Sequence, residues 1–163
     1  MVSWAEFQEQ AGALGAFAAE RVDGPGLVLV ATLRRDGWPR ISPVEPLLFD
    51  GRLYLGMMWR STKALDLLRD PRVLVHSVVS RKDGSEGDVK VYGRALEVRD
   101  PDERERYCVA LQEKIGWRPE DDRFHLFAVD VERVGCVRFG DGRQRTEAWR
   151  PGGPPTVVDR PPE

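Results

Sequence analysis

Short runs of apolar residues, several of them alternating with polar ones, fill the middle of the chain and predict β-strands. The runs cover residues 27–34, 38–49, 52–58, 73–79, 89–98, 124–129, 134–139 and 144–149. Asp-Gly pairs at 36–37, 50–51 and 141–142 are typical of tight type I′ hairpin turns. We therefore predict a mainly β (α+β) domain of antiparallel strands, in which the first three strands form a meander.

Three other segments have the spacing and the end signals of amphipathic helices. Residues 3–20 begin with Ser3 and Glu6, which form a capping-box pattern. Residues 61–70 begin at a serine suited to cap a helix and stop before a proline. Residues 100–115 begin with Asp-Pro and stop at a glycine. These helices should pack around the predicted sheet.

The second predicted strand, residues 38–49, contains three prolines, at positions 39, 43 and 46. Proline cannot donate a ladder hydrogen bond, so this strand should lie at an edge of the sheet or bulge near Pro43. Bulges and open edges free backbone groups and redirect side chains, and they often lie beside ligand sites.

Composition agrees with one folded domain of ordinary size. The chain has 163 residues, is 41% hydrophobic and carries a formal net charge of -2. This balance gives no signal for nucleic acid or for a membrane surface, and we expect a cytoplasmic protein with Cys108 and Cys136 reduced. We assign residues 1–150 to a single domain with its N-terminal helix, and residues 151–163 to a proline-rich, flexible tail.

Several common kinds of active site are missing from the sequence. His76 and His125 are the two histidines, and neither belongs to a zinc-binding pattern. No nucleophile elbow and no phosphate-binding P-loop occurs either. His76 lies in an apolar strand and is expected to be a hydrogen-bonded core residue. Redox chemistry stays open, because there a cofactor carries the reaction.

One junction has charges of an unexpected sign. Arg60 and Lys63 flank the start of the helix at 61–70, where the helix dipole already presents positive charge. Together with the hydroxyls of Ser61 and Thr62 and free backbone N–H groups, they make a candidate phosphate site. The alternative is a pair of solvated surface cations, with Lys63 pairing to Asp66.

The order of these segments resembles the pyridoxamine-5′-phosphate-oxidase-like split β-barrel superfamily, which includes FMN proteins and deazaflavin F420-dependent reductases. The resemblance spans residues 7–150. It rests on G-W-P-R-I-S-P-V at 37–44, L-Y-L at 53–55, S-T-K at 61–63 followed by Asp66, D-P-R-V at 70–73 and V-Y-G-R-A at 91–95. It implies a split β-barrel of about six to seven antiparallel strands with peripheral helices.

The resemblance also implies a homodimer with FMN, or alternatively F420, in a groove between subunits. By position, the cofactor phosphate would lie on Arg60, Ser61, Thr62 and Lys63. The ring system would lie against the second strand and the end of the third, at Arg40, Ser42, Pro43, Val44, Met57 and Met58. A C-terminal aromatic residue, here Trp149, would lie near the cofactor.

Two differences from members of this family argue against vitamin B6 oxidation and against haem degradation. Residues 143–150 differ from the arginine-rich substrate motif of the vitamin B6 oxidases, and no histidine follows His125, as the haem-degrading relatives require. What the resemblance still implies is an FMN- or F420-dependent oxidoreductase that binds its cofactor at a dimer interface and transfers hydride to a small organic substrate, and we assign no catalytic residue. The alternatives are a flavin-binding protein for storage or sensing, and a barrel without ligand that serves as an interaction module.

Overall fold

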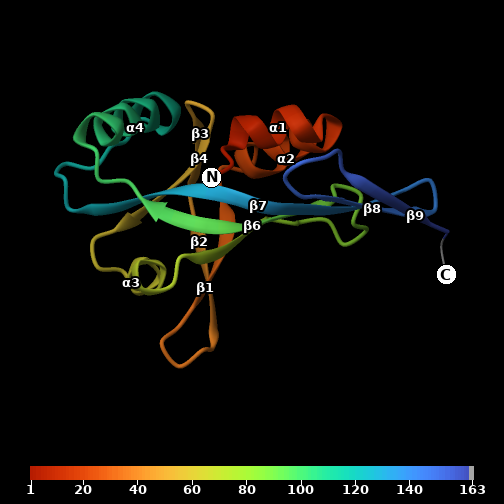
Figure 1. Ribbon diagram of the computed structural model, residues 1–163, viewed down its shortest axis with the longest axis horizontal. Helices are drawn as coiled ribbons and strands as arrows, with labels where there is room; N and C mark the ends of the chain where they lie inside the picture. Colours follow the sequence, from red (N-terminus) through yellow and green to blue (C-terminus); the bar gives the residue numbers. More distant parts are fainter. Residues whose placement is uncertain (162–163) are drawn as a thin grey trace.

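Nine strands and four helices make up residues 1–161, the part of the chain that the computed structural model describes (Figure 1). In chain order they are α1 (Trp4–Ala11), α2 (Ala13–Asp23), β1 (Val28–Leu33), β2 (Pro39–Val44), β3 (Pro46–Phe49), β4 (Arg52–Met58), α3 (Thr62–Arg69), β5 (Arg72–Ser77), β6 (Asp88–Glu97), α4 (Pro101–Ile115), β7 (Phe124–Gly140), β8 (Arg143–Trp149) and β9 (Thr156–Arg160).

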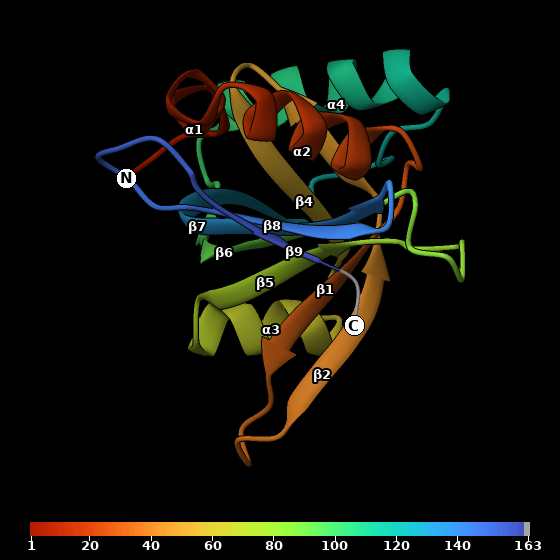
Figure 2. The same cartoon turned by 90° about the vertical axis from the view of Figure 1, so that its right-hand side faces the viewer.

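All strand pairs are antiparallel, and the main sheet follows the order β2-β1-β5-β6-β7-β4-β3. The ladder does not close into a ring, because β2 and β3 stand at its two ends. Figures 1 and 2 place α1, α2 and α4 on one side of the central strands and α3 on the other. The predicted mainly β fold with peripheral helices is therefore confirmed.

The predicted three-stranded meander is wrong, because residues 38–49 form two strands that lie at opposite ends of the sheet. β2 pairs with β1 and β3 pairs with β4, and the chain changes direction at Glu45 between them. Pro43 and Pro46 lie in these two end strands, where a missing N–H group is tolerated. The predicted edge position of the proline-containing strand is thus confirmed for β2, and β3 is a second edge.

The predicted N-terminal helix is interrupted at Gly12, whose φ of 53° lies outside the range of a right-handed helix. The break lets the start of α2 pack against the end of α1. A Cβ atom on Gly15 would lie 2.7 Å from the Cα atom of Gln8, so only glycine fits there. The capping box of Ser3 and Glu6 is present as predicted.

The two strands predicted at 124–129 and 134–139 are one strand, β7, that runs through the charged residues between them. β6 pairs with β7 along its length, and the register shifts between Tyr92 and Gly93 because Glu132 has no partner. A Cβ atom on Gly93 would lie 2.0 Å from the carbonyl oxygen of Asp130. The glycine therefore permits the close approach of two backbones at a bulge.

The C-terminal segment is also more ordered than predicted. Thr156–Arg160 pairs with β8 as strand β9, so residues 151–161 are not a loose tail. All five residues of β9 are exposed, so the strand adds nothing to the core. The rest of the predicted tail, residues 162–163, lies outside the described residues.

The predicted type I′ turns are present at two of the three Asp-Gly pairs. Asp50 and Asp141 have φ angles of 47° and 50°, and each is followed by a glycine with positive φ. The turn at Asp36 is different, because residues 34–38 connect β1 to β2 and among them only Gly37 has positive φ. A type I turn followed by a glycine bulge accounts for this pattern.

Two hydrophobic clusters fill the interior. The larger lies between the sheet and helices α1 and α2, and it contains Trp4, Phe7 and Leu14. The smaller lies beneath α4 and joins Tyr107 and Leu111 to Tyr54 and Leu126 of the sheet. Within residues 1–161, no helix has the length and apolarity that crossing a membrane requires.

We expect Gly93→Ala to lower the free energy of unfolding by about 1–3 kcal/mol, because the new methyl group meets a backbone carbonyl that cannot move aside. Gly135→Ala is the matched control, since its nearest contact would be an ordinary 3.8 Å. Urea unfolding of both variants measures the difference. Equal stability of the two would contradict the close approach described for Gly93.

Candidate functional site

The turn between β4 and α3 holds the four residues of the predicted phosphate site. β4 ends at Met58, and Arg60 then adopts a positive φ of 55°, which is uncommon for a residue other than glycine. Ser61 takes the N-cap position of α3 as predicted, but its side chain makes no capping hydrogen bond. Its Oγ atom is buried and has no partner within residues 1–161.

The cations at this turn are also without acidic partners. Neither Arg60 nor Lys63 makes an ion pair with another described residue. The alternative in which Lys63 pairs with Asp66 is wrong, because Asp66 is only 4% exposed and its carboxylate is bound by Thr32, Arg40 and Arg69. An orphaned hydroxyl, two free cations and an uncapped helix start are the features that bind a phosphate group.

Asp66 instead fixes α3 to the first hairpin. Its Oδ2 atom accepts hydrogen bonds from Thr32 Oγ1 at 3.0 Å and from Arg40 Nε at 2.7 Å, and its Oδ1 atom accepts one from Arg69 Nη1 at 3.3 Å. Burial alone would raise the pKa of Asp66, but the hydrogen bonds from Arg40 and Thr32 outweigh it and hold the pKa below its usual value. The helix start therefore has a fixed place beside β1 and β2.

The predicted ring contacts on β2 do not share one face. Arg40, Ser42 and Val44 pair with the core-facing residues of β1, whereas Pro43 faces the other way. Successive side chains of a strand point to opposite faces, so one flat ring cannot contact all four within this chain. Arg40 is in addition held by Asp66.

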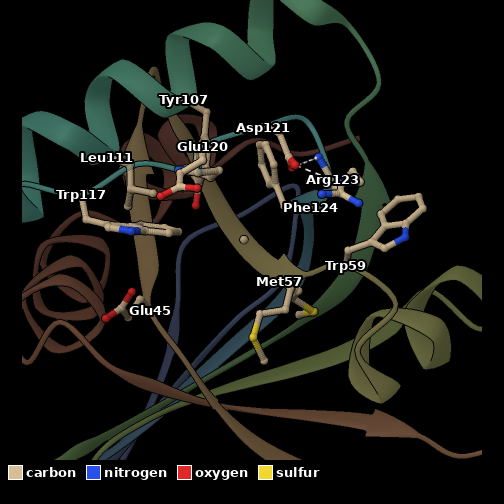
Figure 3. A pocket seen from close by; sticks show the side chains of 13 residues that line it. Glu45, Met57, Trp59, Tyr107, Leu111, Trp117, Glu120, Asp121, Arg123 and Phe124 are labelled. Atoms are coloured by element: carbon tan, nitrogen blue, oxygen red, sulfur yellow. Dashed lines mark hydrogen bonds and ion pairs between the residues drawn. The ribbon is translucent and has the colours of Figure 1, made fainter.

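Met57 and Met58, the predicted contacts on β4, border a cavity of about 460 Å³ between β4 and α4 (Figure 3). We call it the β4–α4 cavity. Its walls come from β4 and the following turn, from the residue before β3, from α4, and from the loop after α4: Glu45, Gly56, Met57, Met58, Trp59, Tyr107, Leu111, Trp117, Pro119, Glu120, Asp121, Arg123 and Phe124.

Tyr107 reaches this cavity from α4 and rests on β4. Its side chain is 3% exposed, and a Cβ atom on Gly56 would lie 2.3 Å from its hydroxyl oxygen. Burial raises the pKa of the Tyr107 phenol, so the hydroxyl stays protonated. The helical spacing of Tyr107 and Leu111 indicates only a packing face. The signal in the sequence that could have placed them at a cavity is Gly56 inside a strand.

Trp149 lies elsewhere. The prediction brings it near the cofactor, but the residue is 1% exposed and packs against Phe7 of α1, with ring centroids 4.9 Å apart. It does not line the β4–α4 cavity. In this chain Trp149 is a core residue, because Phe7 of α1 packs on it at the end of β8.

The histidines are placed differently from each other. His76 is half-buried rather than in the core, and its Nδ1 atom lies 2.6 Å from the carbonyl oxygen of Ser77. His125 is 5% exposed and stacks on Trp59, with ring centroids 4.7 Å apart. In the described part of the chain, no group of three or more metal-binding side chains comes together.

Comparison with known proteins adds a family and a fold. A sequence profile described as pyridoxamine 5′-phosphate oxidase matches residues 14–138. A search of curated protein sequences gives no match. Among solved structures, an FMN-binding protein from Nostoc punctiforme, described as pyridoxamine 5′-phosphate oxidase-related, is 15% identical over 93% of this chain and 98% of its own, with a TM-score of 0.66.

Two further structures show the same fold in proteins that bind other ligands. A heme-binding protein from Mycobacterium smegmatis is 19% identical over 83% of this chain and 57% of its own, with a TM-score of 0.65. PhzG from Burkholderia lata, solved with tetrahydrophenazine-1-carboxylic acid, is 15% identical over 91% of this chain and 88% of its own, with a TM-score of 0.65. At these identities the likeness establishes the fold alone.

We expect Asp66→Asn to lower the free energy of unfolding by about 2 kcal/mol at pH 7, because hydrogen bonds to a charged group contribute roughly 1.5–3 kcal/mol. The lowered pKa of Asp66 means that its contribution is present above the unfolded-state pKa and is lost as the pH falls through the folded-state value. The difference between wild type and variant should therefore shrink in acid.

Urea unfolding at pH 7 and at several acidic pH values measures this difference. Asp141→Asn is the control, because Asp141 is an exposed turn residue without a partner within residues 1–161. A stability difference that stays constant down to strongly acid pH would contradict the role given to the Asp66 carboxylate.

Proposed function

The chain belongs to the pyridoxamine 5′-phosphate oxidase family, and on that premise we propose that it binds FMN at the turn between β4 and α3. Deazaflavin F420 is the alternative cofactor. The proposed reaction is hydride transfer between the bound flavin and a small organic molecule. The observation that carries the proposal is the buried, unpartnered Ser61 Oγ between two unpaired cations.

The residues of the turn fit a phosphate group. The Ser61 hydroxyl is an available hydrogen-bond donor, and the first N–H groups of α3 have no side-chain cap. Arg60 and Lys63 supply positive charge, and charge-assisted hydrogen bonds to a phosphate are the stronger kind. Thr62 is exposed and adds a second hydroxyl. FMN and F420 both carry a phosphate, so this turn by itself does not favour one over the other.

The ring system of the cofactor would lie against Met58 at the end of β4, with Met57 beneath it in the core, where it is 4% exposed. A bound flavin supplies reversible hydride transfer, and the protein supplies position and electrostatics. Met58 is 74% exposed, so it is free to pack against a ring. The β4–α4 cavity opens beside these methionines, where a substrate could approach the ring.

We also propose that the protein acts as a homodimer. The face of β1 and β2 that points away from the core carries Leu29, Ala31, Ile41 and Pro43, and Ile41 is 68% exposed. Neighbouring strands extend this face with Leu74 and Tyr92. Basic residues at the same face of β5 and β6, among them Lys90 and Arg94, form a polar rim around these apolar side chains. An exposed apolar patch with a polar rim is typical of an interface, and a second copy of the same face would cover it.

Titration with FMN and with F420, followed by flavin and deazaflavin fluorescence, tests the cofactor proposal. The double variant with Arg60→Ala and Lys63→Ala should weaken binding by about 2 kcal/mol or more, roughly 30-fold in Kd, because two charged contacts to the phosphate are lost. Lys82→Ala is the control, since Lys82 is an exposed cation of the loop between β5 and β6.

Unchanged affinity in the double variant would refute the phosphate site. Failure of both cofactors to bind at high micromolar concentration would refute cofactor binding itself. A bound and reduced cofactor that no member of a panel of organic acceptors oxidises would favour storage or sensing over catalysis.

Ile41→Glu tests the dimer, because it places a charge at the centre of the proposed interface. We expect the wild type to sediment as a dimer at micromolar concentration and the variant to sediment as a monomer. Val157→Glu on β9 is the control, since Val157 is 45% exposed on a strand outside this face. A monomeric wild type, or a dimer insensitive to Ile41→Glu but broken by Val157→Glu, would overturn the proposed interface.

A further inference from the structure

We propose that the β4–α4 cavity binds an organic cation, namely a small aromatic ring that carries a fixed positive charge and a hydrogen-bond acceptor. One part of this inference, that the bound cation is the substrate of the flavin, rests on the proposed function. The binding itself is argued from the residues of the cavity.

The charges that line the cavity are unbalanced. Arg123 is the basic residue among them, and it is already paired, because its Nε atom lies 2.9 Å from Asp121 Oδ2. Glu45 and Glu120 make no ion pair and no hydrogen bond with any residue in the range 1–161. Two uncompensated carboxylates therefore face the cavity and attract a cation.

Aromatic side chains also line the cavity. Figure 3 shows the carboxylates of Glu45 and Glu120 on either side of the Trp117 indole. Trp117 is 56% exposed, so one face of its ring is open to a ligand. Cations bind favourably over aromatic faces, and tryptophan is the strongest of these. Phe124 is less available, because the guanidinium of Arg104 lies 4.1 Å from its ring centroid.

Tyr107 supplies the third feature, a directed hydrogen-bond donor. The residue is 3% exposed, yet no described residue hydrogen-bonds to its hydroxyl, which lies against Gly56 in the cavity wall. The hydroxyl oxygen is the accessible end of this otherwise buried side chain, so the hydroxyl can donate a hydrogen bond to a ligand in the cavity. An acceptor on the ligand, such as an amide oxygen, would accept a hydrogen bond from the Tyr107 hydroxyl.

The volume of the cavity and the negative charge of its lining together define the class of ligand. A volume of about 460 Å³ accepts a molecule of one or two rings. An anion of the same size would meet two unpaired carboxylates and would be repelled. A neutral ring would gain the aromatic and hydroxyl contacts but not the charge attraction, so its affinity should be intermediate.

Three pyridine derivatives of nearly equal size test the sign of the site. 1-Methylnicotinamide is a cation, nicotinamide is neutral and nicotinate is an anion, and all three carry an acceptor oxygen. Isothermal titration of the purified protein without flavin should rank their affinities in that order, with about tenfold between cation and neutral ring. Equal or tighter binding of nicotinate would overturn the proposal.

Variants assign the preference to residues. The double variant with Glu45→Gln and Glu120→Gln should lower the affinity for 1-methylnicotinamide about tenfold and leave that for nicotinamide unchanged. Tyr107→Phe should lower both affinities by a similar factor and keep their ratio. Glu113→Gln on the exposed side of α4 is the control and should change neither. A double variant that keeps the wild-type preference for the cation would overturn the assignment.

The same variants separate this inference from the proposed function. FMN or F420 titration of the Glu45 and Glu120 double variant should show that the cofactor still binds, since neither residue belongs to the turn at 60–63 that would hold the phosphate. Cation binding without any flavin binding would refute the proposed function and support the cation site. Flavin binding without a preference for 1-methylnicotinamide over nicotinate would refute the cation site alone.

Discussion

The carboxylate of Asp66 is the constraint on which the candidate cofactor site depends. A buried charge without partners is very costly, so α3 can dock only where Thr32 and Arg40 meet that carboxylate. Docking there fixes the start of α3 at the end of β4, with the Ser61 hydroxyl buried and the neighbouring cations unpaired. The position of the proposed phosphate site thus follows from an interaction made by Asp66 one turn further along the same helix.

A second constraint acts on the other side of β4. Gly56 has no side chain, so Tyr107 of α4 can lie against the strand, and α4 and the loop after it then enclose the β4–α4 cavity. Any larger residue at position 56 would displace the Tyr107 hydroxyl. One strand therefore organises both sites: its interior glycine borders the cavity and its C-terminal end leads into the phosphate turn.

The sequence was sufficient for local features and insufficient for distant contacts. Alternation, Asp-Gly pairs and helix caps located most strands and helices, because those signals act within a few residues. The continuity of β7 was missed, since its charged stretch is accommodated by a bulge opposite Gly93 on another strand. Local spacing offers Lys63, three residues away, as the alternative partner of Asp66, whereas its actual partner Arg40 is 26 residues away. Tyr107 and Glu45 entered the site through packing that no local pattern encodes.

The electrostatics of the two proposed sites suit them to different ligands. The phosphate turn is positive through Arg60 and Lys63, and the β4–α4 cavity is negative through Glu45 and Glu120. Met57 and Met58 lie between them as an apolar boundary that neither kind of charge favours. A phosphate would be attracted to the turn and repelled by the cavity. An organic cation would be attracted to the cavity and repelled by the turn. Opposite charges on two bound ligands would also attract each other, so occupation of one site should raise the affinity of the other.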